Sequence, residues 1–267
     1  MLRDITIGQY YPADSIIHKL DPRVKLFATL LYVISLFTFR SIVGFIIATI
    51  FLIAVIVLSK VPFGYMVKGL RAILVILIIT ALFNLFLTPG ETLVKFGIFR
   101  ITREGLLSAV KMAVRLIYLI LGTSVVTLTT TPNALTDGME KALRPLNKIR
   151  VPVHEIAMMM SIALRFIPIL VEETDKIMKA QIARGADFET GNLLKKAKNM
   201  VPLLVPLFIS AFRRANDLAM AMEARCYHGG SGRTKMKPLK YQKRDGIAYG
   251  AVLGYFVLIL VVRFTGL

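Results

Sequence analysis

Two short motifs carry the most specific chemistry in this 267-residue sequence. The motifs are Ala183-Arg184-Gly185 and Ala224-Arg225-Cys226. Each combines alanine, arginine and a small residue at the end of a long predicted helix, and the two arginines are 41 residues apart. A guanidinium group offers a fork of donors to carboxylates or backbone carbonyls, so such a helix end can dock into a polar groove. Arginine near a helix C-terminus also suits the helix dipole, but two matched copies favour docking over that local role.

Apolar residues precede each arginine on the same helical stripe. In the helix that ends at Arg225, the aligned residues are Ala211, Ala215, Leu218 and Met222. Ile177 and Ala180 precede Arg184 in the same way. Spacings of three and four residues place side chains on one helix face. Each arginine therefore extends an apolar face, which predicts that apolar burial and a directional polar contact occur together in a partner groove.

Other reactive side chains form weaker patterns. The single cysteine, Cys226, excludes an intrachain disulfide and a cysteine-based metal site. His18, His154 and His228 lack the spacing of metal ligands. Ser161 lies seven residues after His154, which is too distant for a serine–histidine couple that lacks a further partner. No G-x-x-x-x-G-K-[ST] loop is present, so nucleotide chemistry is expected in partner proteins.

The composition favours a membrane protein. Hydrophobic residues make up 56% of the chain and charged residues 19%, whereas a soluble domain is about one quarter charged. So much apolar surface exceeds what one core of this size can bury, and lipid is the expected second solvent. Residues 1–22 have no continuous apolar run, so no signal peptide is expected there.

Five apolar segments are predicted to cross the bilayer as helices, because a crossing helix needs about 20 predominantly apolar residues. The segments are approximately 26–39, 42–58, 72–87, 106–130 and 247–262. Only Arg40 and Ser41 separate the first two, which predicts a tight helical hairpin. Lys111 and Arg115 lie within the fourth segment and are expected to face the bundle interior or to snorkel.

The positive charge of the chain is unevenly distributed. The formal net charge is +18, and residues 141–244 hold 20 Lys and Arg against 8 Asp and Glu. A basic block between apolar segments is typical of the cytoplasmic side of a membrane protein, and this reading is favoured over nucleic-acid binding. The N-terminus and the basic block are therefore expected in the cytoplasm of a multi-pass protein of a prokaryotic cell membrane.

Residues 131–244 are predicted to form three helices that do not cross the membrane. The first starts at Thr131-Pro132 and reaches about residue 147, the second covers about 152–183, and the third about 193–225. Pro168, Pro202 and Pro206 predict kinks or breaks. These helices are judged too charged to span and too apolar to be solvated alone, so they should lie at the cytoplasmic interface or pack on one another.

The expected architecture is an all-α integral membrane protein. A bundle of about four spans covers residues 1–130, the basic helical region covers 131–244, and a final span covers 245–267. Gly246, Gly250 and Gly254 place small residues along one face of that last helix. Packing within the bundle is favoured over a partner-binding role for this stripe.

The sequence resembles a known transporter family. The similar segments are Gly8-Gln9-Tyr10-Tyr11 through Ser15 to Leu20-Asp21-Pro22-Arg23-Val24-Lys25-Leu26, the two alanine-arginine motifs, and Ala219-Met220-Ala221-Met222-Glu223-Ala224-Arg225 leading into Tyr227. Together they are similar, over essentially the whole chain, to the transmembrane component EcfT of energy-coupling factor transporters. Cys226 departs from the family pattern, which usually has Gly or Ser there.

The resemblance implies a non-catalytic coupling subunit. In this family two ABC-type ATPases, EcfA and EcfA′, use ATP and Mg, and a membrane-embedded S component binds a vitamin or metal ion. The resemblance implies that Arg184 docks in one ATPase and Arg225 in the other, leaving open which is which, and that this chain binds no cofactor. It also implies that methionines seat the S component, with ordinary core packing as the alternative. These are Met158, Met159, Met160, Met220 and Met222.

Two other functions remain as alternatives: a membrane-embedded enzyme, and a stand-alone channel or carrier. A channel would need polar or ionisable residues within the spans. The spans offer Thr80, Asn84, Thr123 and Ser124 but almost no charge. Transport by the purified chain alone in liposomes would support that alternative.

Overall fold

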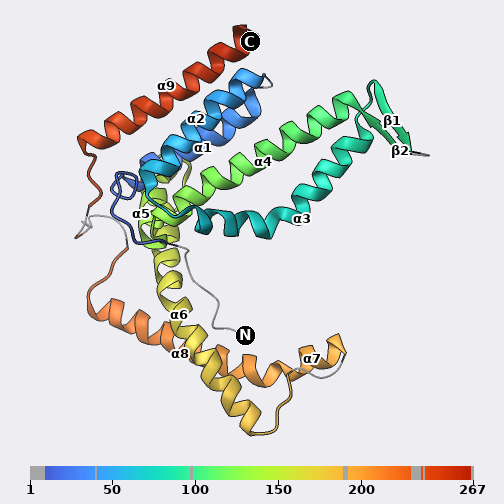
Figure 1. Cartoon of the computed structure of the whole chain (residues 1–267). Helices are drawn as coiled ribbons and strands as arrows, with labels where there is room; N and C mark the ends of the chain where they lie inside the picture. Colours follow the sequence, from blue (N-terminus) through green and yellow to red (C-terminus); the bar gives the residue numbers. More distant parts are fainter. Residues whose placement is uncertain are drawn as a thin grey trace. The chain divides into compact units, whose positions relative to one another are not determined.

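The computed structural model describes residues 10–39, 41–96, 99–188, 192–229, 236 and 238–265. The described chain is helical apart from one two-stranded hairpin (Figure 1). The α-helices are α1 Pro22–Thr38, α2 Ile42–Ser59, α3 Phe63–Leu87, α4 Arg103–Thr129, α5 Pro132–Leu143, α6 Val153–Ala183, α7 Leu193–Asn199, α8 Val201–Ala224 and α9 Lys243–Thr265. A short 3-10 helix covers Arg144–Ile149, and the strands are β1 Thr92–Phe96 and β2 Phe99–Thr102.

The chain divides into two compact units. The bundle unit comprises the described residues of 8–139 and 239–267, and the arm unit comprises those of 140–238. In the bundle unit α1 packs against α4 and α9, and α2 packs against the same two helices. Its core includes Leu36, Met66 and Ile259, all fully buried. In the arm unit α6 crosses α8.

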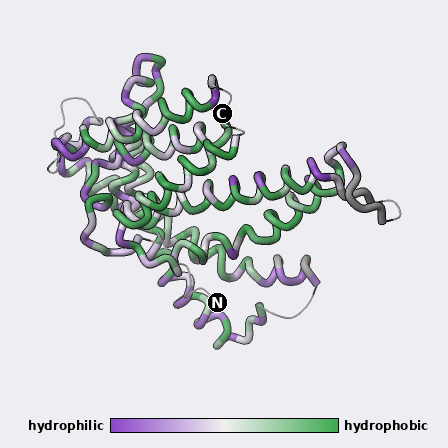
Figure 2. Tube along the Cα trace, turned by 45° about the horizontal axis from the view of Figure 1, so that its top comes forward, coloured by the Kyte–Doolittle hydropathy of each residue, from purple (hydrophilic) through white to green (hydrophobic). Residues whose placement is uncertain are grey.

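The apolar helices match the five predicted segments. Hydrophobic residues run along whole helices, while hydrophilic ones gather at helix ends and loops (Figure 2). α2, α4 and α9 are long and apolar enough to cross a membrane. α3 bends by 61° between Arg71 and Ile73, where the predicted third segment begins. α1 has 17 residues, at the short end of the range for a span, and is not among the helices that are long and apolar enough to cross a membrane. Ser41 caps α2 by accepting a hydrogen bond from the Gly44 amide, and Arg40 lies outside the described residues.

α6 is more apolar than the sequence analysis expected. It contains an 18-residue stretch with a mean hydropathy of 1.6 and no more than two charged residues. By its composition, therefore, the helix is not too charged to span a membrane, and that prediction is wrong. Its charged side chains cluster toward the C-terminal end, where they include Glu172, Glu173, Asp175, Lys176 and Lys179.

A small antiparallel hairpin, which no sequence pattern predicted, joins α3 and α4. β1 pairs with β2 in the register Val94 to Ile101 and Phe96 to Phe99, with an irregularity after Thr92. Residues 97 and 98 between the strands lie outside the described residues. Strands of four or five residues are too short for a clear alternation of apolar and polar positions.

Prolines divide the helices of residues 131–244 more sharply than predicted. The expected third helix is two helices, because Asn199 ends the first, Met200 is the N-cap of α8, and Pro202 occupies the first turn of α8. The first predicted helix likewise divides, with Pro145 at the start of the 3-10 segment. Its predicted start is confirmed, since the Thr131 hydroxyl accepts a hydrogen bond from the Ala134 amide.

The glycine stripe of α9 faces outward. A Cβ atom built on Gly246, Gly250 or Gly254 meets nothing within 4 Å. The opposite face carries the buried residues Tyr255 and Ile259. In the described part of the bundle unit the stripe therefore does not serve the internal packing that the sequence analysis favoured.

Candidate partner-docking surface

The end of α6 forms a Schellman motif. The Ala186 amide donates to the Gln181 carbonyl at 2.9 Å, and the Gly185 amide donates to the Ile182 carbonyl at 2.9 Å. This pair of bonds requires a left-handed residue just after the cap. Gly185 supplies it with φ 87°, so Arg184 is the C-cap residue of the helix.

The end of α8 repeats that geometry bond for bond. The Tyr227 amide donates to the Met222 carbonyl at 3.1 Å, and the Cys226 amide donates to the Glu223 carbonyl at 2.8 Å. Arg225 is the C-cap residue, and Cys226 holds the left-handed position with φ 55°. A non-glycine residue is uncommon in that conformation. The two sequence motifs are therefore equivalent in backbone structure as well as in composition.

Both arginines of these caps are exposed. Neither guanidinium forms a hydrogen bond or ion pair with any residue that the structure describes. The flanking alanines, Ala183 and Ala224, are exposed as well. Each helix therefore ends in a small apolar surface and a guanidinium group without a partner in the described chain. This combination suits insertion into a groove lined by carboxylates or carbonyls.

A polar cluster fastens α6 to α8 where they cross. Glu173 of α6 accepts hydrogen bonds from the Ser210 hydroxyl and from Arg214, whose Nη2 lies 2.8 Å and whose Nε lies 3.2 Å from Oε2. Both guanidinium donors converge on one carboxylate oxygen, and such charge-assisted hydrogen bonds are stronger than bonds between neutral groups. The crossing therefore links the two capped helix ends through one set of side chains.

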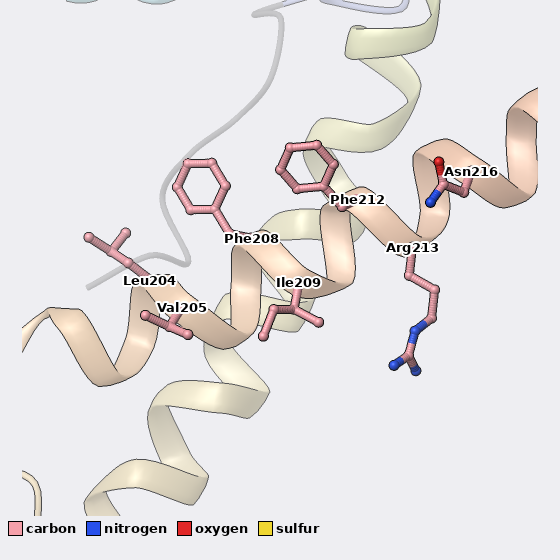
Figure 3. A pocket seen from close by; sticks show the side chains of 7 residues that line it. All are labelled: Leu204, Val205, Phe208, Ile209, Phe212, Arg213 and Asn216. Carbon is pink, nitrogen blue, oxygen red and sulfur yellow. The ribbon is translucent and has the colours of Figure 1, made fainter.

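The middle of α8 carries a broad apolar surface that the sequence analysis missed. The side chains of Phe208 and Phe212 are 62% and 67% exposed, and their rings stack with centroids 6.5 Å apart. Figure 3 shows both rings projecting from one side of α8, with Ile209 and Arg213 on another. An open depression of about 660 Å³ is lined by Leu204, Val205, Phe208, Ile209, Phe212, Arg213 and Asn216. Leu204, Phe208 and Phe212 recur every four residues, and this signal could have revealed the surface.

The methionines predicted to seat a partner lie partly on exposed surface. Met159 and Met220 are well exposed, and Met160 is also exposed. Met158 and Met222 are half-buried. Three consecutive residues of a helix point in directions about 100° apart, so Met158, Met159 and Met160 do not share one face.

The N-terminal motif is a structural junction in the bundle unit. Asp21 caps α1, Pro22 takes the first helical position, and Arg23 folds back onto the Asp21 carboxylate at 2.9 Å. The Asp21 amide donates to the carboxylate of Asp245 in α9 at 2.9 Å. These residues are 224 positions apart in the sequence, and no local pattern predicts the contact. Ser15 bonds to His18 within the preceding turn. Gly8 and Gln9 of the motif lie outside the described residues.

The position of Arg115 confirms the expectation that a basic residue of α4 faces the bundle interior. Its Nη2 donates to the Phe39 carbonyl at 2.9 Å, and its guanidinium lies near the rings of Phe37 and Phe45. The side chain therefore faces the neighbouring helices of the bundle unit.

The residues considered for the alternative functions have other partners. The Ser161 hydroxyl donates to the Ala157 carbonyl, whereas His154 pairs with Glu140 at 2.9 Å, so the two do not form a couple. The hydroxyls of Thr80 and Thr123 bond to carbonyls of their own helices. Among the described residues, no group of three or more His, Cys, Asp or Glu is placed to hold a metal ion.

Known proteins similar to this chain agree on one family. The CbiQ family model, described as "Cobalt transport protein", matches residues 13–236. The "Energy-coupling factor transporter transmembrane protein EcfT" of Clostridium kluyveri is 60% identical over 250 residues, covering 93% of each chain. The protein of that name from Thermosediminibacter oceani is 54% identical over 248 residues, 93% of this chain and 94% of its own. The Bacillus subtilis protein is 46% identical over 264 residues, 98% of this chain and 100% of its own.

These relatives are transporter subunits, and several helices of this chain are apolar enough to span a membrane. The resemblance stated from the sequence is thereby confirmed, and the chain is a multi-pass membrane protein. It belongs to the EcfT family, the transmembrane components of energy-coupling factor transporters.

Proposed function

We propose that this chain couples two cytoplasmic ABC-type ATPases to a membrane-embedded, substrate-binding S component. The observation that carries the proposal is the pair of identical helix caps, each ending in an exposed arginine without a partner in the described chain. Two like grooves on two related ATPases would accept two like helix ends. ATP and Mg then belong to those partners, and this chain supplies no catalytic group.

Mechanical coupling requires that the two ends move together. Glu173, Ser210 and Arg214 fasten α6 to α8, so a displacement of one cap by an ATPase is transmitted to the other helix. The arm unit is proposed to lie on the cytoplasmic side, where its basic excess belongs under the positive-inside rule. There, the hydrogen bond from Ser210 and the adjacent Arg214 hold the pKa of the Glu173 carboxyl below its usual value.

The exposed surface of α8 is proposed as the seat of the S component. Phe208, Phe212 and their neighbours form an apolar surface of the size and aromatic character that interface centres favour. Met220 and Met159 supply further flexible apolar contacts, as the resemblance implies. The transported compound, a vitamin or a metal ion, would be selected by the S component.

Charge reversal of the two arginines tests the docking role. Affinity purification of the assembled complex should recover less ATPase with Arg184→Glu or Arg225→Glu, and none with both. Breaking the charge pairing of a buried interface arginine typically costs about 2–5 kcal/mol. Lys179→Glu, an exposed cation on the same helix as Arg184, is the matched control and should leave recovery unchanged.

Two outcomes would reject the proposal. A double variant that recovers both ATPases at the wild-type yield would show that the caps do not dock. Uptake of substrate into liposomes containing only this chain would show a stand-alone carrier instead.

A further inference from the structure

An apolar pocket of about 370 Å³ lies within the bundle unit. Its walls come from the turn before α1 and from α1, α2, α4 and α9. The apolar lining includes Ile17, Val55, Leu58, Val126 and Ala251. Pockets of roughly 300–1,000 Å³ with mostly apolar walls and a few polar groups are typical of sites for small ligands.

The polar part of the pocket is cationic. Lys25 and Arg244 line it, and no Asp or Glu is among its lining residues. Lys25 is only 5% exposed, and its Nζ donates to the Thr129 carbonyl at 2.8 Å, the Thr130 hydroxyl at 3.2 Å and the His18 carbonyl at 3.3 Å. These oxygens are neutral, whereas a buried charge usually has a counter-charge. Within the described chain Lys25 has no ion pair.

Two further polar atoms at this pocket lack a hydrogen-bond partner. Thr129 is 2% exposed, and its buried hydroxyl has no partner in the described structure. The buried Nε of Arg244 has none either. Buried polar groups are nearly always hydrogen-bonded, so an acceptor from a ligand is the expected complement.

The nearby carboxylates are already engaged. Asp245 accepts from the amides of Asp21 and Gln242, at 2.9 and 2.8 Å. Asp21 accepts from Arg23. Asp21 also attracts Lys25 electrostatically, but neither carboxylate lines the pocket, where the charged lining residues are Lys25 and Arg244.

The polar groups gather at one end of the bundle helices. Lys25 lies in the first turn of α1, Arg244 in the first turn of α9, and Thr129 ends α4. Apolar walls continue along the helices from there. A cationic end at the helix termini and an apolar interior match an amphiphile at the membrane surface. We propose that this pocket binds an anionic phospholipid. The phosphate accepts hydrogen bonds from Arg244 and Thr129, and its negative charge faces Lys25. One acyl chain lies among the apolar walls.

Native mass spectrometry of the purified complex, with added phosphatidylglycerol or phosphatidylcholine, tests the proposal. Phosphatidylglycerol should remain bound in preference to phosphatidylcholine. Arg244→Gln should reduce its occupancy several-fold, whereas Lys243→Gln, which removes the adjacent exposed charge outside the pocket, should not. Ala251→Phe fills the pocket without changing charge and should also displace the lipid, with Leu253→Phe on the same helix as its control.

Photolabelling locates the acyl chain independently. Phosphatidylglycerol carrying a diazirine on its acyl chain should label residues 51–58 or 247–252. Equal binding of both lipids, equal effects of Arg244→Gln and Lys243→Gln, or labelling outside the pocket would each overturn the proposal. If Arg244→Gln does not fold, the comparison of Ala251→Phe with Leu253→Phe decides the question.

Discussion

The bundle unit and the arm unit differ in whether they contain a core of buried apolar residues. Leu36, Met66 and Ile259 of the bundle unit are fully buried. The 31 residues of α6 include only Val153 and Ala157 as buried positions, and the 24 residues of α8 include only Leu203. The bundle unit therefore has a core of its own, whereas the arm unit leaves most of its apolar surface for contact with something else.

The largest expected effect comes from truncating one buried side chain of the bundle unit and one exposed side chain of the arm unit. Leu36→Ala should lower the unfolding free energy of the bundle by about 2–5 kcal/mol, because it opens a cavity in a packed core. Phe208→Ala should change that stability by far less, because the ring is 62% exposed. Thermal unfolding of the purified chain in detergent measures both.

The recovery of partner proteins by affinity purification should show the reverse order, with the larger effect from Phe208→Ala. Phe208→Ala should reduce copurification of the S component while leaving the two ATPases in place. A Phe208→Ala chain that unfolds as readily as Leu36→Ala would contradict the contrast between the units.

A smaller effect is expected at the link between α1 and α9. Asp245→Ala leaves the amides of Asp21 and Gln242 without their acceptor, and an unsatisfied buried donor costs about 1–3 kcal/mol. The variant should lose thermal stability, and the amides near Asp21 should exchange faster with deuterium. Lys243→Ala, an exposed change in the same helical turn, serves as the control and should do neither.

The two helix caps of the arm unit offer a comparison within one region. Cys226→Gly should stabilise the end of α8, because a non-glycine residue in the left-handed conformation costs about 1–2 kcal/mol. Gly185→Cys should weaken the end of α6 for the same reason. Hydrogen exchange at the Tyr227 and Ala186 amides reports the two changes, and opposite signs are expected. Equal signs would show that the caps are not equivalent.

The smallest expected effect depends on pH. Because the pKa of Glu173 is lowered in the folded chain, its contribution to stability is present above the ordinary pKa of a glutamate. That contribution is lost as the pH falls from the ordinary glutamate pKa, about 4.3, through the lowered value. The crossing of α6 and α8 should loosen over this range, and Glu173→Gln should remove that part of the pH dependence. Thermal unfolding of both proteins across the pH series measures the difference.

Local sequence patterns predicted the helices and the two caps well. Apolar runs located α1, α2 and α9, because a largely apolar stretch makes up most of each helix. The alanine-arginine motifs located the caps, because a Schellman ending needs a residue able to adopt a positive φ right after the C-cap. Proline marked the start of α8, but the pattern did not distinguish a kink from the full break at Met200.

Features that depend on distant contacts were not predictable in this way. The link from Asp21 to Asp245 joins residues 224 positions apart, and neither has a local signal for the other. The glycine stripe has the spacing of a packing face, yet spacing alone does not say whether a neighbour lies there. The surface around Phe208 and Phe212 had a visible four-residue period, but exposure can be judged only once α6 and α8 are placed against each other.

The exposed rings of Phe208 and Phe212 also affect how much of this protein can accumulate in a cell. Chaperones and proteases continuously remove proteins that display apolar surface. A copy that has found no partner displays this surface permanently, whereas an assembled copy covers it. The abundance of this subunit should therefore follow the supply of its partners, and overproducing it alone should shorten its half-life rather than raise the capacity for transport.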